Sequence, residues 1–274
     1  MSQYHKKPLI HTDHINLKVG DLEKVLAFYQ TVFNFTVISQ STTKALLSAD
    51  GLEPLVILEK LENPQPKSHK QAGLYHFALL LPNLKELSKM ANHLLSLGIS
   101  FNYRDHGITN ALYFTDIECN EIEVVVDRPW PAAQYQLHQL SYNQLLNEAC
   151  DEQWIKIPEG TVVGYIHLHV TDLKKNRIFY EEGIGLKIEI NMGLALFLAD
   201  GGYHHHVAIN FMHQKVLRKN NQSLGLGYYT LVFPTVEKKM EVTNRLEDLG
   251  FEVENINGEF FALDPSGNKI LLAT

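Results

Sequence analysis

The chain has 274 residues, of which 45% are hydrophobic and 20% are charged, and its formal net charge is -7. This length fits one large domain or two smaller ones with a sizeable core, and the composition excludes a disordered chain. The mild acidity argues against a nucleic-acid partner, because phosphate binding needs a basic surface and no run of the chain is strongly basic.

The first half of the chain contains two predicted units, each made of a strand, a helix and three further strands. Apolar residues share one face along each helical segment, and Gly98 provides a stop signal for the second helix. The predicted segments of the first unit are 9–19, 22–33, 35–39, 44–48 and 55–59. Those of the second unit are 74–81, 84–97, 99–103, 111–115 and 121–126.

A connector interrupts this pattern between residues 129 and 160. Prolines lie near both of its ends, and residues 141–149 are predicted to form a helix. The connector therefore divides the chain into a first domain at 8–128 and a second domain at 161–274.

The second half repeats the first. Segments 15–29 and 166–180 are identical at eight of fifteen positions, at an offset of 151 residues. Nearer the end of each half, the turn 116–122 matches the turn 264–270. Matching segments in matching order imply a duplicated domain, and hence four strand–helix–three-strand modules.

Four such modules resemble the vicinal oxygen chelate superfamily, which includes glyoxalase I, the fosfomycin- and bleomycin-resistance proteins and the extradiol ring-cleaving dioxygenases. The resemblance covers nearly the whole chain except the connector. Segments 74–83, 164–173 and 199–210 are most similar to the two-domain bacterial members that resemble catechol-2,3-dioxygenase. The resemblance implies an α+β fold in which four βαβββ modules pair into two incomplete-barrel, or cup, domains, one in each half.

In this superfamily, metal ligands lie on the opening strands, three residues before a leucine-type position, and on the closing strand just after its turn. These positions in the first half hold His14, His76 and Glu123. The resemblance therefore implies a 2-His-1-carboxylate centre within residues 8–128, with coordination positions left open for substrate oxygens.

The same positions in the second half hold Tyr165, Tyr228 and Leu271. None of these is a usual ligand for such a centre. The resemblance therefore implies that residues 161–274 kept the fold and lost this metal site.

Two further residues match positions that contact the substrate in extradiol enzymes. Tyr113 lies ten residues before Glu123, and His106 precedes it in a His-Gly pair. The resemblance implies that both side chains hydrogen-bond to substrate oxygens. The acid/base histidine of these enzymes is expected on the strand at 53–59, which contains no histidine.

Fourteen histidines are many for this length, and several lie in the second half. His167, His169, His204 and His206 fall on alternate positions of predicted strands and are expected to converge in the second cup. Such a cluster suits a metal held by another ligand set, an anionic ligand, or a partly solvated polar lining. We favour the last, because the usual ligands are missing there.

The function that the resemblance implies is a metal-dependent extradiol-type dioxygenase. Its substrate is expected to be a small catechol-like aromatic with two vicinal oxygens. Fe(II) is the expected metal, with Mn(II), Zn(II) and Ni(II) as alternatives. Two other functions remain open: a glyoxalase-like lyase or thiol transferase, and a non-catalytic small-molecule-binding protein of the bleomycin-resistance kind.

The chain is expected to be cytoplasmic, with no membrane partner. No signal peptide is predicted, and no run approaches the ~18 apolar residues of a membrane span. The two cysteines, Cys119 and Cys150, cannot form a disulfide framework. Formation of a homo-oligomer is left open by the sequence.

Overall fold

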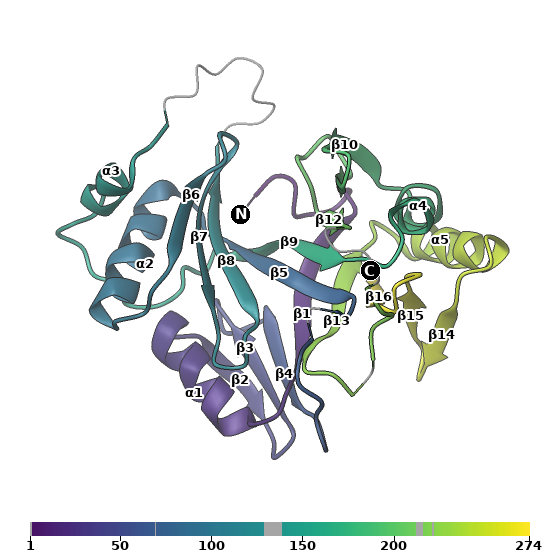
Figure 1. The fold of residues 1–274 in the computed structure, drawn as a ribbon, viewed down its shortest axis with the longest axis horizontal. Helices are drawn as coiled ribbons and strands as arrows, with labels where there is room; N and C mark the ends of the chain where they lie inside the picture. Colours follow the sequence, from purple (N-terminus) through teal and green to yellow (C-terminus); the bar gives the residue numbers. More distant parts are fainter. Residues whose placement is uncertain (1, 69, 129–138, 212–215, 221) are drawn as a thin grey trace.

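The computed structural model describes residues 2–68, 70–128, 139–211, 216–220 and 222–274 (Figure 1). Over these ranges the predicted order of strand, helix and three strands recurs four times. The expected α+β fold with four βαβββ modules is confirmed.

The bounds of the four modules follow the predicted segments closely. The first module consists of β1 (His11–Val19), α1 (Leu22–Phe33), β2 (Thr36–Gln40), β3 (Lys44–Ser48) and β4 (Val56–Lys60). The second consists of β5 (Gly73–Leu80), α2 (Leu84–Ser96), β6 (Asn102–Asp105), β7 (Thr109–Thr115) and β8 (Glu121–Asp127).

The second half has the same order of elements. The third module consists of β9 (Val162–His169), α4 (Leu173–Arg177) continued by the π-helix η2 (Ile178–Ile184), β10 (Lys187–Asn191), β11 (Ala195–Ala199) and β12 (Val207–Asn210). The fourth consists of β13 (Gly225–Val232), α5 (Val236–Asp248), β14 (Val253–Ile256), β15 (Glu259–Leu263) and β16 (Lys269–Ala273). The helix predicted in the connector is α3 (Tyr142–Asn147), and residues 129–138 lie outside the described ranges.

The helix of each module begins in the same way. A polar side chain at the N-cap accepts a hydrogen bond from the backbone NH three residues further on, which satisfies a donor that the first helical turn leaves unpaired. The four caps are Asp21, Asn83, Asp172 and Thr235. Each helix buries its apolar face and lies on the outside of the molecule (Figure 1).

The modules pair across the two halves of the chain. One eight-stranded sheet has the order β14-β15-β16-β13-β1-β4-β3-β2, and the other has the order β10-β11-β12-β9-β5-β8-β7-β6. The first module therefore shares a sheet with the fourth, and the second shares a sheet with the third. The expectation that residues 8–128 and 161–274 each form their own cup is wrong.

Antiparallel pairs at the centre of each sheet join the halves. Strand β1 pairs with β13, where Asn16 lies opposite Tyr228, and β5 pairs with β9, where His76 lies opposite His167. Gly227 is required at the first junction, because a Cβ there would lie 1.7 Å from the Asn16 side-chain oxygen. Each cup is thus built from strands of both halves, and its lining residues come from distant parts of the sequence.

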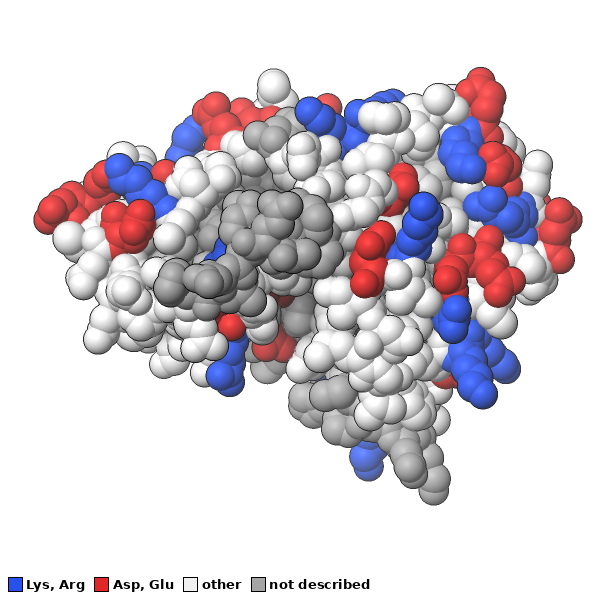
Figure 2. Space-filling model, turned by 90° about the horizontal axis from the view of Figure 1, so that it is seen from above, with Lys and Arg blue, Asp and Glu red and all other residues white. Residues whose placement is uncertain are grey.

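The outer surface carries both signs of charge. On the face seen in Figure 2, acidic and basic side chains are mixed along the edges, and neither sign forms a continuous patch. Among the described residues, no helix is long and apolar enough to cross a membrane.

Candidate metal and substrate site

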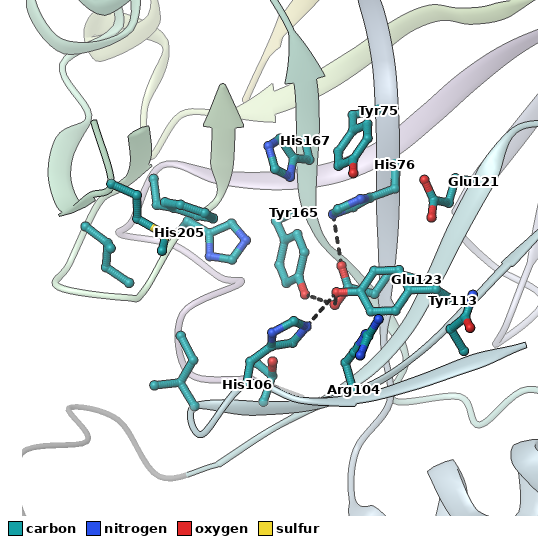
Figure 3. A pocket seen from close by; sticks show the side chains of 16 residues that line it. Tyr75, His76, Arg104, His106, Tyr113, Glu121, Glu123, Tyr165, His167 and His205 are labelled. Atoms are coloured by element: carbon teal, nitrogen blue, oxygen red, sulfur yellow. Dashed lines mark hydrogen bonds and ion pairs between the residues drawn. The ribbon is translucent and has the colours of Figure 1, made fainter. Parts of the chain in front are cut away.

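A cavity of about 690 Å³ opens in the cup that the second and third modules form. Alternation along β5 explains its lining: Phe77 and Leu79 are buried in the main core, whereas His76 faces the cavity. The other lining side chains are Tyr75, Asn102, Arg104, His106, Ile108, Thr109, Tyr113, Glu121, Glu123, Tyr165, His167, Ile190, Met192, Phe197 and His205 (Figure 3).

Glu123 is the centre of the polar contacts in this cavity. Its Oε1 accepts hydrogen bonds from the hydroxyl groups of Tyr113, at 2.7 Å, and Tyr165, at 2.6 Å. Tyr113 lies directly opposite Glu123 in the β7–β8 ladder, which fixes the first of these contacts. The second contact crosses from the second half of the chain. Two phenols therefore hold one oxygen of a fully buried carboxylate.

The other oxygen of Glu123 faces His76. The Nε2 of His76 lies 3.0 Å from the Glu123 Oε2, and both side chains are at least nine-tenths buried. Burial alone would raise the pKa of Glu123, but the contacts with His76 and the two phenols outweigh it and hold this pKa below its usual range. Glu123 is therefore ionised at neutral pH, although it has no contact with solvent.

His106 extends this network toward the mouth of the cavity. The Nε2 of His106 lies 2.9 Å from the Tyr113 hydroxyl, so His106, Tyr113 and Glu123 form a continuous chain (Figure 3). Burial first, and the Glu123 charge second, raise the pKa of Tyr113 well above its usual value. Tyr113 thus remains a protonated hydrogen-bond donor.

His14 does not join this cluster. It lies on β1, in the other sheet, where its Nε2 is 3.0 Å from the Thr230 hydroxyl and its Nδ1 is 2.7 Å from Asp13. The predicted set His14, His76 and Glu123 is thus divided between two cups. The cause is the pairing of modules across the halves, which puts the two opening strands of the first half in different sheets.

Tyr165 occupies the position in this cavity where the predicted metal centre needs a second histidine. It lies seven residues before the helix cap Asp172, as His76 lies seven residues before the cap Asn83. The position equivalent to His76 in the partner module therefore carries a phenol, and the structure brings the two residues to the same carboxylate.

The predicted histidine cluster of the second half is also divided. His167 lines the cavity beside His76, with ring centroids 4.8 Å apart, whereas His169 lies near Asn210 in a neighbouring pocket. His204 is buried behind the cavity, and the Nε2 of His206 bonds to the carbonyl of Tyr4. His167 therefore belongs to the same site as His76, not to a second one.

His205 also lines the cavity, although the sequence did not predict it there. The alternation of side chains along a strand predicted that His204 and His206 face the cup. Strand β12 begins only at Val207, so the side chains of the segment before it do not alternate between two faces. The ring of His205 packs on Tyr165 with centroids 4.0 Å apart. Burial, with help from neighbouring histidines, holds its pKa well below the usual value, so it is a neutral imidazole.

His76 and Glu123 suit one divalent metal ion. The Nε2 of His76 and the Oε2 of Glu123 lie 3.0 Å apart, so these two atoms would be the ones to hold such an ion. The Glu123 Oε2 is buried and makes an ion-pair contact with His76 without a well-aligned hydrogen bond. Over the part of the chain that the structure describes, no three His, Cys, Asp or Glu residues form a metal-holding group. These residues therefore offer two strong protein ligands, His76 and Glu123, which is one fewer than a 2-His-1-carboxylate centre has.

Comparison with known proteins places the chain in a family. A family model described as the Glyoxalase/Bleomycin resistance protein/Dioxygenase superfamily matches residues 11–124. The chain is 37% identical over 269 residues to a catechol-2,3-dioxygenase from Bacillus subtilis (strain 168), an alignment that covers 93% of this chain and 94% of that protein. The chain belongs to this superfamily.

Solved structures share the fold of this chain. A proposed dioxygenase from Bacillus subtilis matches 98% of this chain and 86% of its own, with a TM-score of 0.71 at 12% identity. A glyoxalase I variant from Zea mays matches 96% of this chain and 93% of its own, with a TM-score of 0.62 at 16% identity. At these identities the likeness shows the fold alone.

Proposed function

We propose that the protein is a metal-dependent, extradiol-type dioxygenase that acts on a small catechol-like aromatic. The observation that carries this proposal is the buried pair of His76 and Glu123 in a large cavity, with Tyr113 hydrogen-bonded to Glu123 and His106 to Tyr113. The 37% identity to a catechol-2,3-dioxygenase over most of the chain supports the same reaction class.

His76 and Glu123 would hold the metal ion, and the hydroxyl of Tyr165 is a further oxygen donor beside them. When bound, such an ion supplies a Lewis-acidic centre with open positions for the two adjacent oxygens of the substrate. With only two strong ligands, we expect weaker metal binding than a 2-His-1-carboxylate centre gives. Fe(II) is the metal we propose, because the proposed reaction uses O₂.

The protein residues around the ion have separate tasks in this proposal. Tyr113 gives its hydrogen to Glu123, so its hydroxyl oxygen accepts a hydrogen bond from a substrate hydroxyl, and the contacts with Glu123 and His106 fix the direction of this group. His205, on the opposite wall, takes the proton that the substrate hydroxyl loses. It thereby fills the acid/base role for which the strand at 53–59 has no histidine.

The remaining wall is suited to an aromatic ring. Ile108, Ile190, Met192 and Phe197 are apolar residues that line the cavity. Such a wall buries the face of a ring while its adjacent oxygens point toward His76 and Glu123, as expected of a small-molecule site with few polar groups.

Oxygen consumption tests this function directly. The full chain, loaded with Fe(II) without oxygen, is mixed with O₂ and a panel of catechols that differ in their ring substituents. We expect one O₂ to be consumed per catechol, with a yellow ring-cleavage product. Failure to consume O₂ with every member of the panel would contradict the proposal.

Two matched variants locate the activity. Glu123→Gln keeps the size of the side chain but removes its charge, and we expect at least a hundredfold lower turnover, roughly the upper range for changes around a metal ligand. His14→Gln, in the other sheet, is expected to stay within about twofold of the wild type. Equal losses in the two variants would contradict the assignment of the site.

A further inference from the structure

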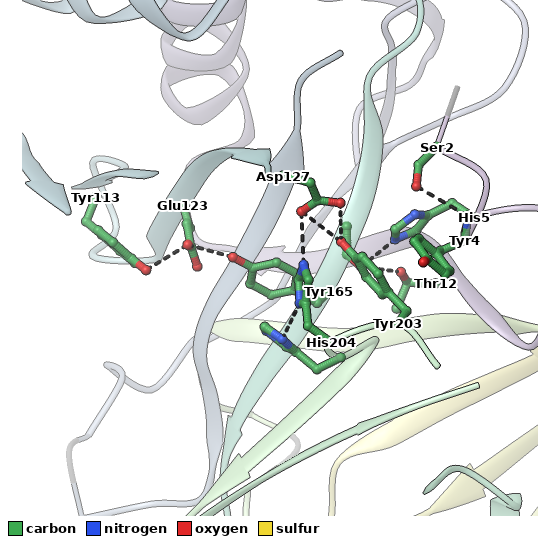
Figure 4. A network of polar contacts seen from close by, with 12 residues as sticks. Ser2, Tyr4, His5, Thr12, Tyr113, Glu123, Asp127, Tyr165, Tyr203 and His204 are labelled. Atoms are coloured by element: carbon green, nitrogen blue, oxygen red, sulfur yellow. Dashed lines mark hydrogen bonds and ion pairs between the residues drawn. The ribbon is translucent and has the colours of Figure 1, made fainter. Parts of the chain in front are cut away.

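Three side chains connect the back of the cavity to the outer end of β8. His205 lines the cavity, and its Nδ1 lies 2.7 Å from the Nδ1 of His204. The Nε2 of His204 lies 2.9 Å from the Oδ1 of Asp127, the last residue of β8 (Figure 4). His204 is fully buried, whereas Asp127 is partly exposed. The row therefore runs from the cavity through the wall of the cup.

With Asp127 as a carboxylate and both rings neutral, these contacts define one arrangement of protons. An ionised carboxylate only accepts hydrogen bonds, so the Nε2 of His204 must donate to Asp127. When its ring is neutral, His204 donates from one nitrogen and accepts at the other, so that its Nδ1 is then an acceptor. The Nδ1 of His205 must then carry the hydrogen of the bond between the two rings.

The consequence concerns the other ring nitrogen of His205. With its Nδ1 protonated and the ring neutral, the Nε2 of His205 has a free lone pair. Tyr165 packs on this ring, and Phe197 meets it edge-on with centroids 5.0 Å apart. The ring is thus held both by packing and by the hydrogen bond of its Nδ1.

We propose that Asp127 and His204 are positioning residues that set the tautomer of His205, so that its Nε2 is the base that receives the substrate proton. This inference rests on the proposed dioxygenase function for its substrate, but the tautomer itself does not depend on that function. The same logic operates in the Ser-His-Asp triad, where a carboxylate fixes the tautomer of the catalytic histidine.

The row also allows the positive charge of the received proton to move from His205 to His204. A substrate hydroxyl gives its proton to the Nε2 of His205, and the hydrogen on the His205 Nδ1 passes to the Nδ1 of His204. The positive charge then lies on His204, whose Nε2 stays hydrogen-bonded to Asp127. Reversal of these two transfers returns the proton to the product.

Tyr203 offers a matched control, because it contacts the same carboxylate without belonging to the row. Its hydroxyl donates to Asp127, at 2.9 Å from Oδ2 and 3.1 Å from Oδ1. Tyr203→Phe therefore removes a neutral partner of Asp127 and leaves the contact with His204 in place.

Nitrogen NMR of histidine rings reads the tautomer directly. The full chain is labelled with ¹⁵N-histidine and loaded with Zn(II), which is diamagnetic, and the His205 signals are assigned from their loss in His205→Gln. We expect a protonated Nδ1 and an unprotonated Nε2 for His205 in the wild type and in Tyr203→Phe. A protonated Nε2 in the wild type would overturn the inference, whether or not the protein cleaves catechols.

Kinetics test the use of this tautomer. In Asp127→Asn we expect the Nδ1–H population of His205 to fall and kcat to drop at least tenfold, with KM within about twofold. Asp127→Glu keeps the carboxylate and should recover part of kcat, and Tyr203→Phe should stay within twofold of the wild type. An unchanged kcat in Asp127→Asn would refute the positioning role. Absence of turnover in the wild type would refute the proposed function and leave the NMR result to decide the tautomer.

Discussion

At the scale of single residues, Tyr165 distinguishes this site from the centre that the sequence predicted. It occupies the position equivalent to His76, but its hydroxyl donates its hydrogen bond to Glu123. Burial first, and the nearby Glu123 charge second, raise the pKa of Tyr165 well above its usual value, so it is a protonated phenol in the absence of a cation. A neutral phenol is a weaker metal ligand than an imidazole.

Tyr165→His should therefore strengthen metal binding. The new imidazole would complete a 2-His-1-carboxylate set with His76 and Glu123, and we expect at least tenfold tighter Fe(II) binding in an anaerobic titration. Tyr228→His, at the equivalent position of the other cup, is the control and should leave the affinity unchanged. Weaker binding by Tyr165→His would show that the phenol is the better partner of this site.

Lys219 gives the stability of the protein a specific dependence on pH. Burial first, and the nearby charge of Lys18 second, lower its pKa to about 7, and its Nζ donates to the carbonyl of Leu226. In the unfolded chain the pKa returns to the usual value near 10.5. Between these two values the unfolded chain binds more protons, so this residue makes stability rise with pH from about 7 to about 10.

We expect Lys219→Met to remove this rise. Urea unfolding at pH 7 and pH 9 should show that the wild type gains about 2 kcal/mol relative to Lys219→Met, since one proton corresponds to ~1.4 kcal/mol per pH unit. Lys44→Met, on an exposed position of β3, is the control and should parallel the wild type. Parallel pH dependence for Lys219→Met itself would contradict this account.

At the scale of elements, the π-helix η2 depends on a glycine. A Cβ on Gly183 would lie 2.5 Å from a terminal carbon of Leu246 in α5, so a side chain fits there only if the buried Leu246 side chain moves. Alanine is normally favoured over glycine in a helix by ~1 kcal/mol. Here the clash reverses that preference.

Gly183→Ala should destabilise the protein by about 1–3 kcal/mol, the range for overpacking, as measured by urea unfolding. The penalty should shrink when Leu246 is also changed to alanine, because that change removes the clashing atoms. A Gly183→Ala variant with a higher free energy of unfolding than the wild type would contradict this account of the contact between η2 and α5.

The elements themselves were predictable because their signals are local. The apolar face of α1, the cap at Asp21 and the connector helix α3 all follow from residues within one or two turns of each other. His205 was not predictable in this way, because it precedes β12 in a segment without regular structure. Its direction is set by contacts with Tyr165 and His204, which lie outside any sequence period.

At the scale of the whole molecule, the pairing of modules determines which residues meet. Every module has the same local pattern, so pairing within a half and pairing across the halves satisfy the sequence equally well. The choice is made by long-range contacts such as the close crossing of β1 and β13 at Gly227. This is why the sequence identified His76 and Glu123 together but assigned His14 to the wrong cup.

The two halves should therefore be unable to fold apart. When residues 1–138 and 139–274 are produced as separate chains in one cell, we expect them to purify together as a one-to-one complex. Each eight-stranded sheet contains strands from both halves, so neither half can complete a sheet alone. Produced alone, each half should lack a cooperative unfolding transition. Two halves that fold independently and do not associate would contradict the observed sheet order.

The position of a bound metal ion tests the central claim most directly. Crystals of the full chain loaded with Fe(II) without oxygen should give an anomalous difference peak at the iron absorption edge, located between the Nε2 of His76 and the Oε2 of Glu123. The peak should disappear in Glu123→Gln and persist in His14→Gln. A peak beside His14 in the other cup, or none at the His76–Glu123 pair, would contradict the account.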